Sequence, residues 1–184
     1  MEAPAVTRRR RPFLAPLWLT LLALVVTAGI AWSVYRAAGT TVVLLVPTAA
    51  KEPGTIADPP LSAEGEEQAQ RLARLLGDAA GVGGLDAIYV SDEQRARQTA
   101  APLAERLQRV PTVFPSADAA ASAARALREH PGGTVLVIGA AGTLPQMLQE
   151  LTGAKAAPPP AASDVVYVVS VPTFGRAQVV RLKF

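Results

Sequence analysis

Two apolar runs without alternation constrain the fold of this chain more than any other feature of its sequence. Residues 41–46 and 134–138 are β-branched and aliphatic, with no polar residue at every second position. A strand that buries one face alternates, whereas an uninterrupted apolar strand is typical of a parallel sheet covered by helices on both faces. The two runs therefore predict an α/β fold.

The segments around these two strands alternate between amphipathic helices and short strands. Helices are expected at 62–76, 91–108, 118–130 and 143–151, and strands at 85–90 and 110–114. The end of the chain, 165–171 and 176–184, alternates around a Pro- and Gly-containing turn and predicts a hairpin at the edge of the sheet. This order predicts a three-layer α/β/α domain over residues 40–184, with a mostly parallel sheet and a C-terminal β-hairpin.

An uncharged run of 23 residues, 13–35, precedes the domain. At ~1.5 Å per residue it would span roughly 30 Å, and Trp18, Trp32 and Tyr35 stand where interfacial aromatics are expected. The sequence predicts one transmembrane helix here. Because four arginines lie in residues 1–12, we expect a basic cytoplasmic N-terminus and a single-pass anchor in the inner membrane of a bacterium, with the domain on the periplasmic side.

A cleaved export signal is the alternative interpretation of this segment. Residues 10–14 resemble a twin-arginine motif, and residues 37–39 supply small residues of the kind found at cleavage sites. A signal's apolar region usually has only ~7–15 residues, so we expect a retained anchor. Both interpretations export the domain.

Charge and composition exclude several classes of function. Residues 37–184 hold 13 Lys or Arg against 14 Asp or Glu, so we expect no nucleic-acid partner. The absence of cysteine excludes disulfides, thiolate metal sites and cysteine nucleophiles. We expect no metal site and no cofactor. The partners that remain are the membrane, a protein and a phosphate-like anion.

Several motifs in the domain carry a family resemblance. The middle block, LDAIYVSDEQRARQTAAPLA, contains the pattern SxxxRAxQTA; TTVVLLV precedes it, DPPLSAEGEEQAQRLARLL forms the first helix, and TVLVIG is followed by Thr143 and Pro145. Over nearly all of residues 40–184 the chain resembles the histidine phosphatase, or phosphoglycerate mutase-like, superfamily in its short single-domain form.

The resemblance implies a specific chemistry. In that family the first strand ends in an Arg-His-Gly or Arg-His-Ala motif, whose histidine attacks phosphorus, and a second histidine follows a later strand. These groups and an arginine of the second helix surround the phosphoryl group. A neutral imidazole is a nucleophile near pH 7, and guanidinium groups neutralise the charge on the phosphoryl oxygens.

This chain departs from the family pattern at the reacting positions. The motif arginine falls on Pro47, the nucleophilic histidine on Thr48 and the second histidine on Ala140, whereas Arg95 matches the arginine of the second helix. We therefore expect no catalytic residue and a pseudoenzyme. The resemblance implies a vestigial phosphate pocket lined by Arg95, Thr48, Lys51, Ala140 and Thr143.

No other histidine can take over. His130, the single histidine of the chain, precedes the strand 134–138, whereas Ala140 follows it. At ~3.3 Å per residue the two lie more than about 15 Å apart. We expect His130 to be a solvent-exposed residue at a helix end, stabilised by the helix dipole.

The favoured hypothesis is a membrane-anchored pseudoenzyme that acts by binding or scaffolding, and two alternatives stay open. One is a divergent phosphatase or phosphoesterase that uses Thr48 as nucleophile and Lys51 as base. The other is an anion sensor, in which Arg95 and the backbone N–H groups of 139–143 bind phosphate or carboxylate. Arg95 is equally expected to pair with Asp92 or another acid at the helix start.

Overall fold

The computed structural model describes residues 17–37, 39–54, 57–77, 84–153, 164–173 and 175–183. The chain divides into two compact units, Met1–Tyr35 and Arg36–Phe184. The basic segment 1–12 lies outside the described residues.

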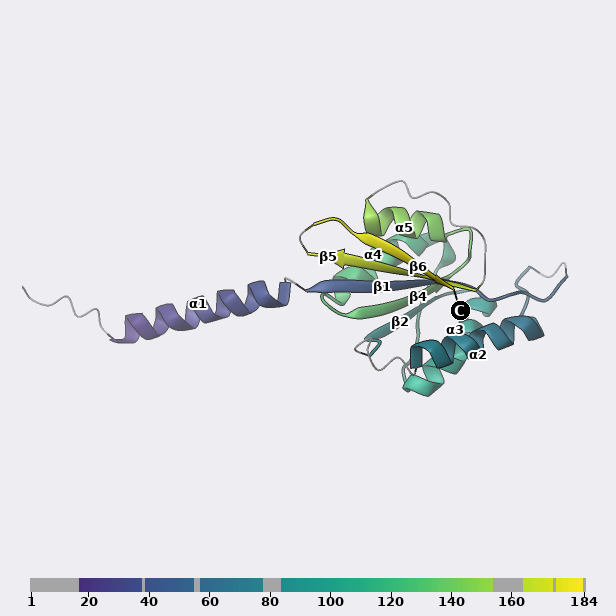
Figure 1. The fold of residues 1–184 in the computed structure, drawn as a ribbon, viewed down its shortest axis with the longest axis horizontal. Coiled ribbons are helices and arrows are strands. Elements are labelled where there is room, and N and C mark those ends of the chain that lie inside the picture. The colour runs from purple at the N-terminus through teal and green to yellow at the C-terminus, as the bar shows by residue number, and fades with distance from the viewer. Residues whose placement is uncertain are drawn as a thin grey trace, which may run out of the picture. The chain divides into compact units, whose positions relative to one another are not determined.

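Six strands form one mixed sheet in the second unit, in the order β3-β2-β4-β1-β5-β6 (Figure 1). β1 is parallel to β4, β4 to β2 and β2 to β3, whereas β5 runs antiparallel to β1 and β6 antiparallel to β5. The parallel core and the closing hairpin predicted from the sequence are therefore confirmed. The strands are β1 Thr40–Pro47, β2 Ala87–Ser91, β3 Thr112–Phe114, β4 Thr134–Gly139, β5 Val165–Pro172 and β6 Gln178–Lys183.

Helices cover both faces of this sheet, as the uninterrupted apolar strands require (Figure 1). On one face, Leu72 and Leu103 pack with Leu44 of β1 and Leu136 of β4. On the other, Met147 packs with alternate residues of the same strands, among them Val43, Val135 and Val137. The helices are α2 Ala63–Gly77 and α3 Gln94–Leu107 on the first face, α4 Ala119–Glu129 and α5 Leu144–Thr152 on the second, and a short 3-10 turn η1 Ser116–Asp118 before α4.

Helix α1 is Leu17–Ala37, and all but its last two residues belong to the N-terminal unit. Within the ranges the structure describes, no helix has the combination of length and hydropathy that membrane crossing requires. The transmembrane helix expected over residues 13–35 is thus not supported by this result. Residues 13–16, and the side chains of residue 17 and of 34–37, lie outside the described part.

The start of α3 differs from its prediction. The sequence places it at Ser91, but Ser91 is the last residue of β2 and the helix begins at Gln94. The residue before it, Glu93, makes no side-chain capping bond. The backbone N–H of Gln94 instead donates to both carboxylate oxygens of Asp58, at 3.1 and 3.0 Å. A cap supplied from a loop 36 residues earlier in the chain leaves no local sequence signal.

Candidate functional site

The carboxyl ends of β1 and β4 meet at one edge of the sheet. Pro47 is in register with Gly139, and the backbone N–H of Thr48 donates to the carbonyl oxygen of Gly139 at 3.0 Å. Thr48 and Ala140, which follow these two parallel strands, therefore lie side by side. In an open α/β sheet ligands bind outside the carboxyl ends of the strands, so we take the two positions as the centre of the candidate site.

The loop after β1 is fixed by side chains of the two helices on one face. The N–H of Ala49 donates to Thr99 Oγ1 of α3 at 3.2 Å, and the N–H of Ala50 donates to Gln68 Oε1 of α2 at 3.0 Å. Thr99 and Gln68 are both buried, at 1% and 4% exposure. Thr99 Oγ1 also donates to the carbonyl of Arg95 at 2.7 Å. These bonds tie the end of β1 to the first turn of α3.

A glycine of α2 permits this close approach. A Cβ on Gly65 would lie 2.2 Å from the carbonyl oxygen of Ala50, a backbone atom that cannot rotate away. The same carbonyl accepts a bond from the N–H of Ser62 at 3.0 Å. Ser62 Oγ in turn accepts from the N–H of Gly65 at 3.1 Å and caps α2.

Arg95 is the cationic residue that the sequence analysis expects at the site. It lies in the first turn of α3, and its Nη2 is 3.5 Å from Glu93 Oε2, so the helix-start acid that pairs with it is Glu93. Asp92, the partner named first from the sequence, accepts instead from the N–H and hydroxyl of Ser116. These hydrogen bonds from Ser116 hold the pKa of Asp92 below its ordinary value.

Two polar atoms at this end of the sheet have no hydrogen-bond partner among the described residues. They are Arg95 Nε and the hydroxyl of Ser91, both shielded from solvent. Ser91, the last residue of β2, is 1% exposed. Buried donors are usually paired, so an uncompensated guanidinium N–H and hydroxyl mark a place where a polar ligand atom would be stabilised. Sequence reasoning missed Ser91, although it is the first residue of the SxxxRAxQTA pattern.

The remaining positions of the expected pocket differ in their surroundings. Thr48 is 6% exposed, and no hydrogen bond among the described residues involves its hydroxyl. Thr143 directs its Oγ1 to the carbonyl of Ala140 at 2.9 Å and closes the turn after β4. Lys51 is exposed and forms an isolated bridge with Leu61 on the outer part of the loop. The geometry thus joins Thr48, Ala140 and Thr143 with the first turn of α3.

His130 lies at the opposite edge of the sheet. The N–H of Gly133, just before β4, donates to the carbonyl of His130, and the N–H of Gly132 donates to Thr41 Oγ1 at the start of β1. The prediction that His130 lies at the other end of β4 from Ala140 is therefore confirmed. The expected full exposure is wrong: His130 is half-buried, because its Nε2 is 3.3 Å from the hydroxyl of Tyr89.

Tyr89 connects this edge to α4. Its hydroxyl donates to Glu129 Oε2 at 2.6 Å, and its ring meets that of His130 edge to face, with centroids 6.1 Å apart. Burial, reinforced by the bond to Glu129, raises the pKa of Tyr89 to about 12. The cluster contributes to packing beneath β2 and stands apart from the candidate site. Over the described ranges, no three His, Asp or Glu side chains are arranged to hold a metal ion.

Comparisons with known proteins agree with this geometry. Residues 48–117 match the family model of the histidine phosphatase superfamily (branch 1). The domain also aligns with the protein histidine phosphatase SixA complexed with tungstate, at 19% identity and a TM-score of 0.63, over 77% of this chain and 96% of that one. No curated protein matches the chain.

Two further solved structures share the fold. A putative phosphohistidine phosphatase SixA from Agrobacterium tumefaciens has 20% identity and a TM-score of 0.60, over 78% of this chain and 99% of that one. A mycobacterial glucosyl-3-phosphoglycerate phosphatase has 15% identity and a TM-score of 0.60, over 76% and 97%. These solved structures share the α/β fold of the domain, and residues 48–117 match the family model.

Proposed function

We propose that this chain is a catalytically inactive member of the superfamily, which acts by binding or scaffolding. The observation that carries the proposal is the position of Thr48 and Ala140 just after the ends of β1 and β4, where the N–H of Thr48 donates to the carbonyl of Gly139. These are the positions at which the family resemblance expects the two histidines. The single histidine of the chain lies at the other edge of the sheet.

The chemistry of the site supports inactivity. A threonine hydroxyl is a weak nucleophile unless a neighbouring base removes its proton. No described side chain hydrogen-bonds to the Thr48 hydroxyl, and the motif arginine position holds Pro47, which carries no charge. The solved structures named above are described as phosphatases, and that description applies to those proteins alone.

An assay on the purified full-length chain tests the proposal. Aryl phosphates and phosphohistidine peptides should give the same background rate with the wild type, Thr48→Ala and Arg95→Ala. Turnover that disappears in Thr48→Ala would overturn inactivity and favour the divergent phosphatase. Turnover that persists in Thr48→Ala but disappears in Arg95→Ala would indicate that the chemistry has moved to another nucleophile.

Anion binding is the second candidate function, because Arg95 Nε and the Ser91 hydroxyl are buried donors without a partner among the described residues. The carboxylate of Glu93 would compete with such an anion, because it already forms an ion pair with Arg95. Thermal unfolding in millimolar phosphate, sugar phosphates or carboxylates tests it. A ligand at 100 Kd adds ~2.7 kcal/mol of stability. Arg95→Ala should remove that shift, and Arg97→Ala, an exposed arginine on the same helix, should retain it.

Membrane anchoring and export form part of the same proposal and are supported by the sequence. The uncharged run 13–35 follows four arginines, and the described side chains of α1, 18–33, are all exposed, with Leu21 at 64% and Leu24 at 66%. We expect the full-length protein to remain in washed membranes. Protease added on the periplasmic side should cleave the domain, whereas protease on the cytoplasmic side should not. A soluble mature form that begins near Gly39 would contradict the anchor.

A further inference from the structure

The last strand of the sheet is exposed on both of its faces. All six residues of β6 are exposed, whereas the strand beside it, β5, is mostly buried or half-buried. The exposed residues include three aliphatic side chains: Val179 at 43%, Val180 at 53% and Leu182 at 49%. Successive side chains of a strand point to opposite faces, so aliphatic surface is open on both sides of β6.

The backbone of β6 is also open along one side. β6 pairs with β5 through six consecutive residue pairs and stands last in the sheet, so its outer N–H and C=O groups have no partner strand among the described elements. Natural edge strands are usually short, carry charged side chains, or are interrupted by proline or a bulge. The opposite edge follows that rule, since β3 has three residues between Pro111 and Pro115. β6 has neither proline nor bulge.

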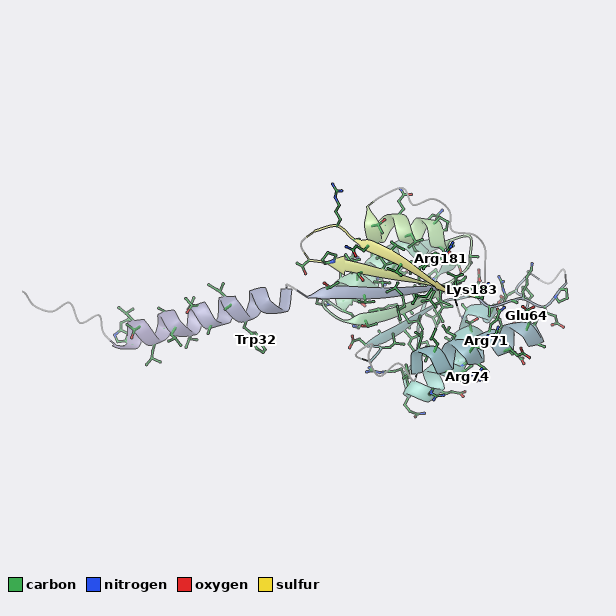
Figure 2. All side chains as sticks on the ribbon, in the orientation of Figure 1. Trp32, Glu64, Arg71, Arg74, Arg181 and Lys183 are labelled. Carbon is green, nitrogen blue, oxygen red and sulfur yellow. The ribbon has the colours of Figure 1, made fainter. Side chains whose placement is uncertain are left out.

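The charge of this edge differs from that of the rest of the domain. Residues 165–184 hold three Lys or Arg and no Asp or Glu, whereas residues 37–164 hold 10 against 14. Figure 2 shows two of the three, Arg181 and Lys183, on β6. Lys183 forms an ion pair with Asp164 at 3.1 Å, and Arg181 has no ion pair among the described residues. The free edge is therefore apolar and positively charged.

We propose that β6 binds an extended segment of a partner protein by strand addition, and that the segment alternates acidic and β-branched residues. Main-chain hydrogen bonds to an open edge supply affinity, and side chains that alternate along the added strand supply specificity. Acidic residues opposite Arg181 and Lys183 complement the charge of the hairpin. A second copy of this chain fits less well, because Arg181 of each copy would bring a positive charge to the same edge.

This surface does not include Thr48, Ala140 or Arg95, so the inference holds whether the pocket is active or not. The probe is a fluorescent hexapeptide of alternating Glu and Val. Its binding to the full-length chain in mild detergent is measured by fluorescence anisotropy at low salt. Saturable binding is expected, with loss of affinity as salt is added. A matched peptide of alternating Lys and Val should not bind.

Two controls separate strand addition from charge attraction alone. The same Glu–Val peptide with the backbone nitrogens of all its residues methylated keeps every side-chain charge but loses its backbone donors on both edges, and its binding should disappear. Arg181→Glu should weaken binding of the unmodified peptide about fivefold to tenfold, because a cross-strand attraction becomes a repulsion. Arg97→Glu makes the same change of charge on α3 and should leave binding unchanged.

Three results would overturn the proposal. One is equal binding of the N-methylated peptide, which would show attraction without strand pairing. Another is an unchanged affinity in Arg181→Glu. The third is a dimer of the wild type, measured by light scattering, that Val180→Asp converts to a monomer, because the edge would then be occupied by a second copy.

Discussion

Asp58→Ala removes the cap of α3, the helix that carries Arg95. Both carboxylate oxygens of Asp58 accept the N–H of Gln94, and Glu93 at the helix start makes no capping bond of its own. The carboxylate also stands at the positive end of the helix dipole. Among the described residues, no other side chain accepts the N–H of Gln94.

The cost can be worked from these contacts. Loss of an N-terminal cap costs ~0.5–2 kcal/mol, and Asp58 is exposed, so water satisfies the freed N–H and the lower part of that range applies. Loss of the charge at the helix end adds ~0.3–1 kcal/mol. We therefore expect about 1 kcal/mol in total, which lowers Tm by ~2–4 °C for a domain of this size. Asp58→Asn keeps an acceptor and should lose about half as much.

Far-UV circular dichroism of the full-length chain is the appropriate assay, because both tryptophans, Trp18 and Trp32, lie in α1 and do not report on the domain. Asp118→Ala is the matched control: Asp118 precedes α4, is exposed, and makes no side-chain capping bond. It should change Tm by less than Asp58→Ala. Equal shifts in the two variants would refute the assignment of Asp58 as the cap.

Three further perturbations test how the site is held. Gly65→Ala should cost several kcal/mol, despite the ~0.5–1 kcal/mol by which alanine favours a helix, because its Cβ would meet the carbonyl of Ala50; urea unfolding measures it. Thr99→Val should cost ~1–3 kcal/mol in the same assay, because the N–H of Ala49 loses its buried acceptor. Tyr89 has a folded pKa raised to about 12 from the ordinary 10, so its contribution to stability is complete below pH 10 and is lost as pH rises towards 12. Tyr89→Phe should therefore lose less stability than the wild type between pH 10 and 12, and an identical pH profile would contradict this.

The sequence predicts the fold well where one physical signal dominates. The uninterrupted apolar runs predict β1 and β4, and both lie at the centre of the sheet with helices on each face. The alternation in the last 20 residues predicts the hairpin β5–β6. These patterns arise from burial, which depends on each segment's own side chains.

Features that depend on distant contacts escape the same reasoning. The start of α3 depends on Asp58, and the half-burial of His130 depends on Tyr89, 41 residues away in sequence. The sequence predicts that Arg95 pairs with an acid at the start of the helix, but it does not single out Glu93. The choice depends on Ser116, a residue of a later segment, which binds Asp92. The positions of Thr48 and Ala140 were predictable because each directly follows a parallel strand, and such strands end at one edge.

Trapping a phosphoryl group on the protein tests the central claim most directly. The full-length chain is mixed with an aryl phosphate or a phosphohistidine peptide, quenched at alkaline pH within a single turnover, and measured by intact mass. Because neither Thr48 nor Ala140 provides an imidazole, the account predicts no species heavier by one phosphoryl group. An adduct that forms in the wild type and disappears in Thr48→Ala would contradict the claim that this site has lost phosphoryl transfer.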